Sequence, residues 1–384
     1  MTTPDVDGLL EDVAREVGLD DYGDATFRDG LEPLWWSGFH EGDLTEIGEL
    51  AFAGQIRMNL ANRLRVLDWH RTHPELADTR VEAPLILVGM PRSGTTALSH
   101  LLAADPENRS LLAWEATESI PPPTTETYQT DPRFEAARNA TSPTEILNPE
   151  FKAIHHDEPD DAMECTVLHA QHFQSLIYST VFNLPAYDEW LLPSKWHGAV
   201  RYHEQVLQVL QSECPGRWQL KSPQYGLLLD ELFEIYPDAR LVVTHRDPVK
   251  IAASTFSLLR CLTGTFTNHD HTEYIVSHWP DTLSALLARA MDARDRIGET
   301  SFFDVAYADL VRDPVAVVGT IYQRFGIEWN DEKEQYFRAF HAANPQHKYG
   351  THTYSLAEVG VERGPLDERF ARYTERYDVP KEDA

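Results

Sequence analysis

The stretch from Ala83 to Leu98 constrains the fold of this 384-residue chain more than any other part of it. Leu85 to Val88 form a short continuous apolar run, which is typical of a strand buried on both faces. Gly89 ends the run, Gly94 follows five positions later, and an amphipathic stretch from Ala97 to Ala104 predicts a helix. A strand, a glycine-bounded turn and a helix N-terminus together can bind a phosphate, because the N–H groups of the turn converge on the anion and the helix dipole attracts it.

The turn nearly matches the nucleotide-triphosphate P-loop, G-x-x-x-x-G-K-[ST], but Thr95 stands where that motif has its lysine. The only cation in the turn is Arg92. The turn resembles the loop with which sulfotransferases bind the 5′-phosphosulfate of 3′-phosphoadenosine 5′-phosphosulfate (PAPS). The resemblance implies that Arg92 reaches the transferring group and that the co-substrate is bound by Pro91, Arg92, Ser93, Gly94, Thr95 and Thr96. A glycine turn without a ligand is the alternative, although such a turn has no need of these polar side chains.

Composition limits the partners and the compartment of the protein. The formal net charge is −29, which argues against binding to nucleic acid or to an anionic membrane surface, so a PAPS site must be a local basic pocket. The three cysteines lie far apart and are odd in number, which does not suggest a disulfide framework. No apolar run approaches the roughly 18 residues of a membrane-spanning helix, and the N-terminus lacks the pattern of a signal peptide. We therefore expect a cytoplasmic protein without stable membrane insertion, and the sequence is compatible with a homodimer.

Strands alternate with helices through most of the chain. Apolar strands are predicted at 85–88, 218–221, 240–244 and 302–305, and helices at 97–104, 195–210, 224–236, 248–260 and 314–325. This alternation predicts an α/β fold with a mostly parallel sheet flanked by helices. Apolar residues at helical spacing predict that residues 1–80 form a helical cap packed on the core. Residues 81–384 then form the main domain, with an irregular, proline-containing insertion at about 119–200.

The resemblance to sulfotransferases also implies a catalytic base. Sulfuryl transfer needs a group that takes the proton of the acceptor hydroxyl. In the bacterial and tyrosylprotein types this group is a glutamate shortly after the P-loop helix, and Glu115 holds a similar place here; Glu118 and His156 are the alternatives. The cytosolic types use a histidine after a K-T-H motif, and the matching segment here is Lys221-Ser222-Pro223, so that histidine is absent.

Three further positions resemble the family's ligand contacts. Lys221 ends a predicted strand, at the edge where open α/β sheets bind ligands, and the resemblance implies that it holds the sulfuryl group. Arg246 follows the strand at 240–244, and Ser254 comes eight positions later, as in the family's 3′-phosphate site; a guanidinium can donate two parallel hydrogen bonds to a phosphate. Tyr307 resembles the tyrosine that contacts the adenine end of PAPS, although Ala308 replaces the usual glutamate beside it.

A polar cluster between His155 and His172 raises a metal site as an alternative. It contains His155, His156, His169 and His172 together with several acidic residues and Cys165. However, no H-x-x-x-H, H-E-x-x-H or C-x-x-C spacing occurs there. We therefore expect this cluster to line the acceptor pocket, and we expect no bound metal.

Taken together, these features predict a P-loop sulfotransferase-like fold and an enzyme that moves a sulfuryl group in line from PAPS to a hydroxyl acceptor. Glu115 would act as the base, while Arg92 and Lys221 stabilise the developing charge. One alternative is a P-loop kinase or nucleotide hydrolase, which would need a lysine at position 95 and an aspartate for magnesium. The other is a nucleotide-binding scaffold without activity. The sequence does not identify the acceptor, which is a small molecule, a lipid or a carbohydrate.

Overall fold

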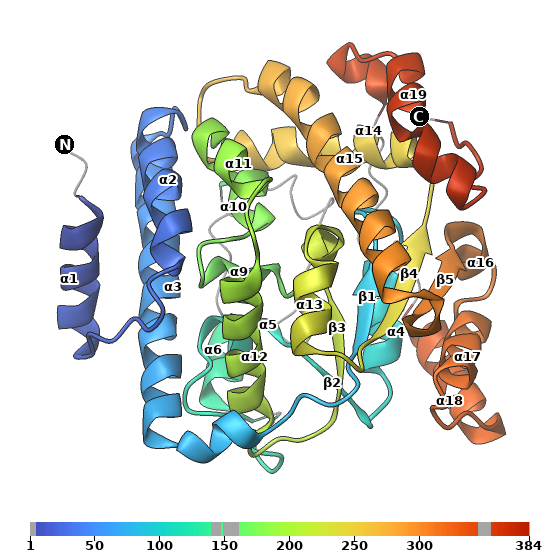
Figure 1. Ribbon diagram of the computed structural model, residues 1–384, viewed down its shortest axis with the longest axis horizontal. Coiled ribbons are helices and arrows are strands. Elements are labelled where there is room, and N and C mark those ends of the chain that lie inside the picture. Colours follow the sequence, from blue (N-terminus) through green and yellow to red (C-terminus); the bar gives the residue numbers. More distant parts are fainter. Residues whose placement is uncertain (1–4, 129, 140–146, 149–160, 345–354, 384) are drawn as a thin grey trace.

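The computed structural model describes residues 5–128, 130–139, 147–148, 161–344 and 355–383. At its centre lies a parallel five-stranded sheet with the order β2-β3-β1-β4-β5 (Figure 1). The strands are β1 (Leu85–Val88), β2 (Asn108–Ser110), β3 (Arg217–Lys221), β4 (Arg240–His245) and β5 (Phe302–Ala306). Because β1 pairs in parallel with both β3 and β4, the segments that follow these three strands all leave the sheet at the same edge.

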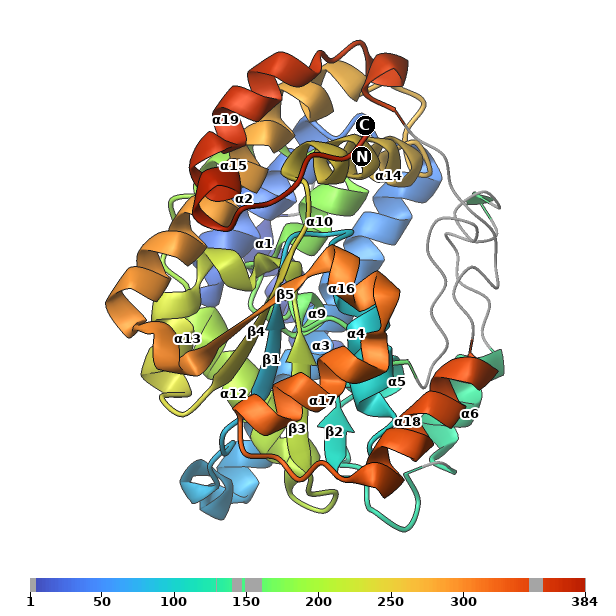
Figure 2. The ribbon, with the colours of Figure 1, turned by 90° about the vertical axis from the view of Figure 1, so that its right-hand side faces the viewer.

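Helices cover both faces of the sheet, because the central strand is apolar on both sides. Leu85 and Leu87 of β1 face one hydrophobic cluster, and Figure 2 looks onto this face. Ile86 and Val88 belong to the larger cluster on the opposite face. The first cluster holds residues of α4 (Thr95–Ala103), α16 (Tyr307–Arg312), α17 (Pro314–Arg324) and α18 (Asp331–Ala343). The second holds residues of α12 (His197–Gln211), α13 (Leu229–Ile235), α14 (Pro248–Thr263), α15 (Thr272–Ile297) and α19 (Arg363–Arg376).

Residues 1–80 are mainly helical in their described part, as expected. They form α1 (Val6–Val17), α2 (Phe27–His40), α3 (Glu46–Thr72) and the short 3-10 helix η1 (Pro74–Asp78). α3 packs on α12, and α2 packs on α11 (Pro185–Leu191). Phe52, Ile56 and Leu60 of α3 are fully buried in the same hydrophobic cluster as Ile86 of the sheet. The N-terminal helices and the sheet therefore share one continuous core.

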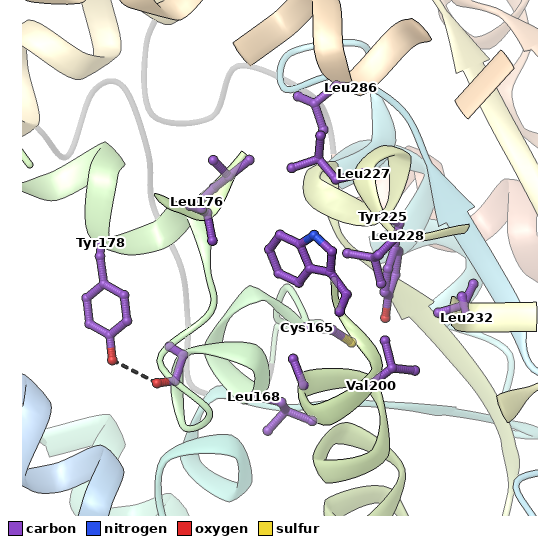
Figure 3. Packing of buried hydrophobic residues seen from close by; sticks show 14 of the residues in the cluster. Cys165, Leu168, Leu176, Tyr178, Val200, Tyr225, Leu227, Leu228, Leu232 and Leu286 are labelled. Atoms are coloured by element: carbon purple, nitrogen blue, oxygen red, sulfur yellow. Dashed lines mark hydrogen bonds between the residues drawn. The ribbon is translucent and has the colours of Figure 1, made fainter. Parts of the chain in front are cut away.

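The described part of the segment between β2 and β3 is also built into this core. It carries α5 (Ala113–Thr117), α6 (Pro132–Asn139), α9 (Thr166–Ala170), α10 (Leu176–Val181) and α11. Figure 3 draws Cys165, Leu168 and Leu176 together with Val200 of α12 among the buried residues of this cluster. The hydroxyl of Tyr178 donates a hydrogen bond to the carbonyl of Ala170 at 2.8 Å, which ties α10 to α9. Residues 161–200 are therefore a packed part of the domain.

The four predicted strands and the helices that follow them are confirmed, with one change. The expected helix at 224–236 is divided into the 3-10 turn η2 (Pro223–Leu227) and α13. Two elements were not predicted: β2, which is three residues long and polar, and the 26-residue α15, whose interior contains Pro280. The remaining 3-10 turns are η3 (Glu299–Ser301) and η4 (Leu356–Val359). Among the described helices, none combines the length and the apolar character needed to cross a membrane.

Candidate active site

The P-loop connects β1 to α4 at the edge of the sheet where the strands end. Arg92 and Gly94 adopt left-handed backbone conformations, with φ of +65° and +92°. Glycine suits position 94 because a Cβ there would lie 2.7 Å from Cδ2 of Leu310. Gly94 is also the N-cap of α4, so the turn leads directly into the N-terminus of a nine-residue helix. This is the local geometry that places N–H groups and a helix dipole around an anion.

Ser93 does not present its hydroxyl to a ligand, contrary to expectation. Its Oγ donates a hydrogen bond to the carbonyl of Met90 at 2.7 Å and lies 2.6 Å from Oγ1 of Thr244 in β4. The side chain is fully buried. Ser93 therefore fixes the turn against the sheet, and only its backbone remains available to an anion.

Lys221 lies at one end of the P-loop. Its ammonium donates a hydrogen bond to Oγ1 of Thr96 at 3.2 Å, so the end of β3 and the start of α4 meet at this point. The side chain of Lys221 is only 4% exposed. Because so little of this side chain reaches water, the ammonium is poorly hydrated. Its attraction for an anion bound in the loop is therefore stronger than it would be at the surface.

Glu164, one of the acidic residues of the polar cluster predicted between His155 and His172, lies beside Lys221. Its Oε1 is 3.6 Å from the Lys221 ammonium, and its side chain is 32% exposed. Two backbone hydrogen bonds hold the segment in place: the N–H of Met163 donates to Leu111 at 2.7 Å, and the N–H of Cys165 donates to Lys221 at 2.8 Å. The segment before α9 thus carries a partly exposed carboxylate to the lysine end of the loop.

Arg246, Ser254 and Tyr307 meet at the other end of the P-loop. The guanidinium of Arg246 lies 4.0 Å from the ring centre of Tyr307 and donates a hydrogen bond to the Arg92 carbonyl at 2.9 Å. The Arg92 side chain also lies here, since its Nε donates to Oγ of Ser254 at 3.1 Å. Arg92 is therefore directed towards Ser254 and the Arg246 group, and not towards Lys221.

The C-terminal tail reaches the same group of residues. Glu382 accepts hydrogen bonds from Nε and Nη2 of Arg246 at 2.9 and 2.8 Å. The backbone N–H of Glu382 donates to Asp247 at 2.6 Å, and Asp247 also pairs with Arg363 at 2.7 Å. A carboxylate of the protein thus occupies the side of Arg246 that is suited to bidentate binding of a phosphate.

Comparison with known proteins identifies the family. Residues 84–331 match the model of the sulfotransferase family. The chain belongs to this family. The crystal structure of sulfotransferase STF9 from Mycobacterium avium resembles this chain with a TM-score of 0.89, and the two sequences are 32% identical. The match covers 100% of this chain and 99% of that one. The crystal structure of sulfotransferase STF1 from Mycobacterium tuberculosis H37Rv is also similar, with 32% sequence identity and a TM-score of 0.85. The match covers 96% of this chain and 99% of that one.

A curated relative is also a sulfotransferase. Omega-hydroxy-beta-dihydromenaquinone-9 sulfotransferase Stf3 of Mycobacterium tuberculosis is 23% identical over 311 residues, which are 77% of this chain and 75% of that protein. The predicted family, the predicted fold class and the transfer of a sulfuryl group to a hydroxyl acceptor are thereby confirmed. The kinase or hydrolase alternative is not favoured.

Glu115, the predicted base, lies in a buried ion pair with Arg109 in this sulfotransferase. Its carboxylate is fully buried and accepts hydrogen bonds from Nη1 and Nη2 of Arg109 at 2.7 and 2.6 Å. It also accepts a hydrogen bond from the N–H of Leu112 at 2.9 Å. Arg109 donates in turn to the carbonyls of Leu210 and Cys214. The pair therefore joins α5 to the end of α12, and no face of the carboxylate is left for an acceptor.

Within the described part of the predicted polar cluster, the two histidines do not lie at a pocket surface, whereas Glu164 is partly exposed. His169 and His172 are buried, and His169 Nδ1 lies 2.7 Å from the side-chain amide of Gln224. Burial lowers the pKa of His169 to about 3, while burial and then the charge of Arg63 lower the pKa of His172. Both rings are therefore neutral parts of the core. His155 and His156, and with them the alternative base, lie outside the described residues.

We expect Glu115→Gln to destabilise this sulfotransferase, because it leaves the buried Arg109 guanidinium without its counter-charge. Breaking one partner of a buried ion pair costs about 3–5 kcal/mol of unfolding free energy. Urea unfolding of the wild type and the variant measures this loss, and Glu118→Gln, at an exposed position three residues away, is the matched control. A Glu115→Gln enzyme that is fully stable but inactive would contradict the structural role and return Glu115 to the position of base.

Proposed function

We propose that this sulfotransferase binds PAPS across the P-loop, with the sulfuryl end at Lys221 and the 3′-phosphate at Arg246, Ser254 and Arg92. The strongest support for this orientation is that the P-loop connects two cationic groups, Lys221 at one end and Arg246 with Arg92 at the other. Thr96 at one end contacts Lys221, and Arg92 contacts Ser254 and Arg246. PAPS carries an anionic group for each of these places, whereas ATP has no 3′-phosphate and would leave the Arg246 group unused.

The remaining predicted contacts fit this orientation. The left-handed turn at Gly94 and the N-terminus of α4 supply backbone N–H groups for the 5′-phosphate between the two ends, in the segment from Pro91 to Thr96. Thr95 is buried at the first helical position, so its backbone is the part nearest to an anion in the turn. Tyr307 lies against Gly94 and Arg246, which suits a contact with the nucleoside.

The transfer itself requires little chemistry from the protein beyond charge and position. The acceptor oxygen forms a bond to sulfur while the bond from sulfur to the bridging oxygen of the 5′-phosphate breaks, and that oxygen keeps the electron pair. Lys221 lies where negative charge gathers on the sulfuryl and bridging oxygens, and its low exposure keeps its field strong. The proton of the acceptor hydroxyl goes to a carboxylate.

We assign that carboxylate to Glu164. It contacts Lys221, which we place at the sulfuryl group, and about a third of its surface is open to an incoming acceptor. Glu115 has neither property, since it is fully buried against Arg109. A carboxylate within hydrogen-bonding reach of the reacting hydroxyl is the arrangement that general base catalysis requires.

The acceptor is a hydroxyl compound that we assign by class alone. Because Stf3 is named for an omega-hydroxylated dihydromenaquinone, a hydroxylated isoprenoid lipid is the first candidate to test, followed by other small molecules and carbohydrates.

The three cysteines are free thiols, which suits a reducing cytoplasm, and the charge of −29 argues against a nucleic-acid partner. The proposal requires no metal in the transfer step, and a non-catalytic scaffold is excluded by turnover with any acceptor.

The first prediction concerns the 3′-phosphate. We expect 3′-phosphoadenosine 5′-phosphate to raise the melting temperature far more than 5′-AMP, and we expect Arg246→Ala to remove most of that difference. A hydrogen bond to a charged group contributes about 1.5–3 kcal/mol, so affinity should fall by about tenfold or more. Arg312→Ala is the control, because Arg312 is 76% exposed on α16. Equal stabilisation by AMP and the bisphosphate would overturn the assignment.

The second prediction concerns the C-terminal tail. Since Glu382 already pairs with Arg246, a 3′-phosphate must displace it. We expect Glu382→Gln to bind the bisphosphate roughly fivefold more tightly, the change that corresponds to an ion pair of about 1 kcal/mol, and to leave AMP binding unchanged. Isothermal titration with Glu375→Gln, at an exposed position of α19, as the control tests this. Unchanged or weaker binding of the bisphosphate would show that Arg246 and Glu382 are only a structural pair.

The third prediction concerns the base. We expect Glu164→Gln to remain folded, to keep the bisphosphate affinity of the wild type and to lose about 10²–10⁴-fold in turnover, the range typical of a general base. Turnover is measured with the first acceptor found active in the wild type. Glu164→Asp is the matched variant, because it keeps the carboxylate and should retain part of the rate. Full activity of Glu164→Gln would place the base elsewhere while leaving the donor site intact.

A further inference from the structure

Three side chains suited to a metal ion gather at a place that the transfer reaction does not use. Asp43 lies between α2 and α3, and His269 and His271 lie between α14 and α15. One potential ligand atom of each lies within 4.8 Å of the others. In Figure 1 the connection between α14 and α15 lies beside the end of α2, on the other side of the molecule from β1 and α4. The cluster is therefore separate from the P-loop.

His271 gives an independent indication of a ligand. The residue is 7% exposed, and its Nε2 is buried without a hydrogen-bond partner among the described residues. A buried polar nitrogen in a native protein normally has a partner. The ring also lines a cleft of about 310 Å³, whose other walls are formed by His269, Asp270, Glu273, Tyr274 and Ser277. An ion in this cleft would supply the missing partner.

The two segments that carry the three side chains are already joined. The hydroxyl of Thr267 donates to the Asp43 carbonyl at 2.6 Å, and the N–H of His269 donates to the Thr267 hydroxyl at 3.0 Å. Leu44 forms a backbone bridge with Thr267. Asp270 is engaged differently, because its Oδ1 accepts hydrogen bonds from the N–H and the hydroxyl of Thr272. The framework that holds Asp43 near the two imidazoles is thus present without the ion.

We propose that Asp43, His269 and His271 bind a divalent transition-metal ion of the Zn²⁺ type. Two imidazoles and one carboxylate are a ligand set that Zn²⁺ prefers, and a water molecule would complete the four positions. Ligands of tetrahedral zinc lie about 3.4 Å apart, so the side chains need to approach by only about 1–1.5 Å. The ion would join the N-terminal helices to the connection between α14 and α15 and stabilise the fold.

The test uses the full chain without an affinity tag, freed of metal by a chelator. We expect one equivalent of Zn²⁺ to bind and to raise the melting temperature. We expect Co²⁺ to give the visible spectrum of a nitrogen and oxygen site, without a thiolate charge-transfer band. His269→Ala and His271→Ala should each weaken binding by more than about 100-fold, because loss of even an outer-shell partner costs 10- to 100-fold.

The controls separate this site from other histidines. His197→Ala, which removes a half-exposed histidine of α12, should bind like the wild type, and so should the variant that lacks both His155 and His156. Because His271 is buried and its variant risks poor folding, the exposed His269 provides the decisive comparison. Unchanged binding by His269→Ala, or no binding by the wild type at tens of micromolar metal, would overturn the proposal.

Discussion

The hydrogen-bonded ladder of β1 with β3 on one side and β4 on the other is the interaction on which the active site depends. Leu87 of β1 lies level with Lys221 of β3 and with Val242 of β4, so that the P-loop emerges between the ends of two neighbouring strands. One neighbour delivers the lysine and the other leads to Arg246. A slip of this register would turn each side chain to the opposite face of the sheet and separate the three groups.

The parts of the site that could be predicted are those encoded by a short contiguous stretch. The P-loop, Lys221 and Arg246 each follow an apolar strand, and parallel pairing alone brings strand ends to one edge. The sequence indicated Glu164 only as one member of a polar cluster, because its contact with Lys221 depends on backbone bonds to Leu111 and Lys221, which are distant in sequence. Glu115 shows a different limit: its partner Arg109 is only six residues away, yet the sequence cannot tell a buried carboxylate from an exposed one.

Each cationic end of the loop is matched by a carboxylate of the protein itself. Glu164 lies beside Lys221 and Glu382 beside Arg246, so the two groups that we assign to the donor are paired in its absence. This arrangement explains how an acidic chain keeps buried cations without the full cost of desolvation. The two pairs also differ in kind, since Glu164 belongs to a packed segment whereas Glu382 lies at the end of the chain.

The burial of Thr95 limits which side chains the P-loop of this chain can carry at that position. Thr95 is 7% exposed at the first position of α4, and its Cγ2 would lie 3.1 Å from a Cβ at position 89. A lysine at position 95 would complete the nucleotide-triphosphate motif in the sequence. However, the buried space that now holds the methyl group of Thr95 could not hold the lysine ammonium, which would have to point elsewhere. A change from sulfuryl to phosphoryl donors therefore needs several coordinated substitutions. The donor end of the pocket thus depends on the small size of positions 89 and 95 taken together.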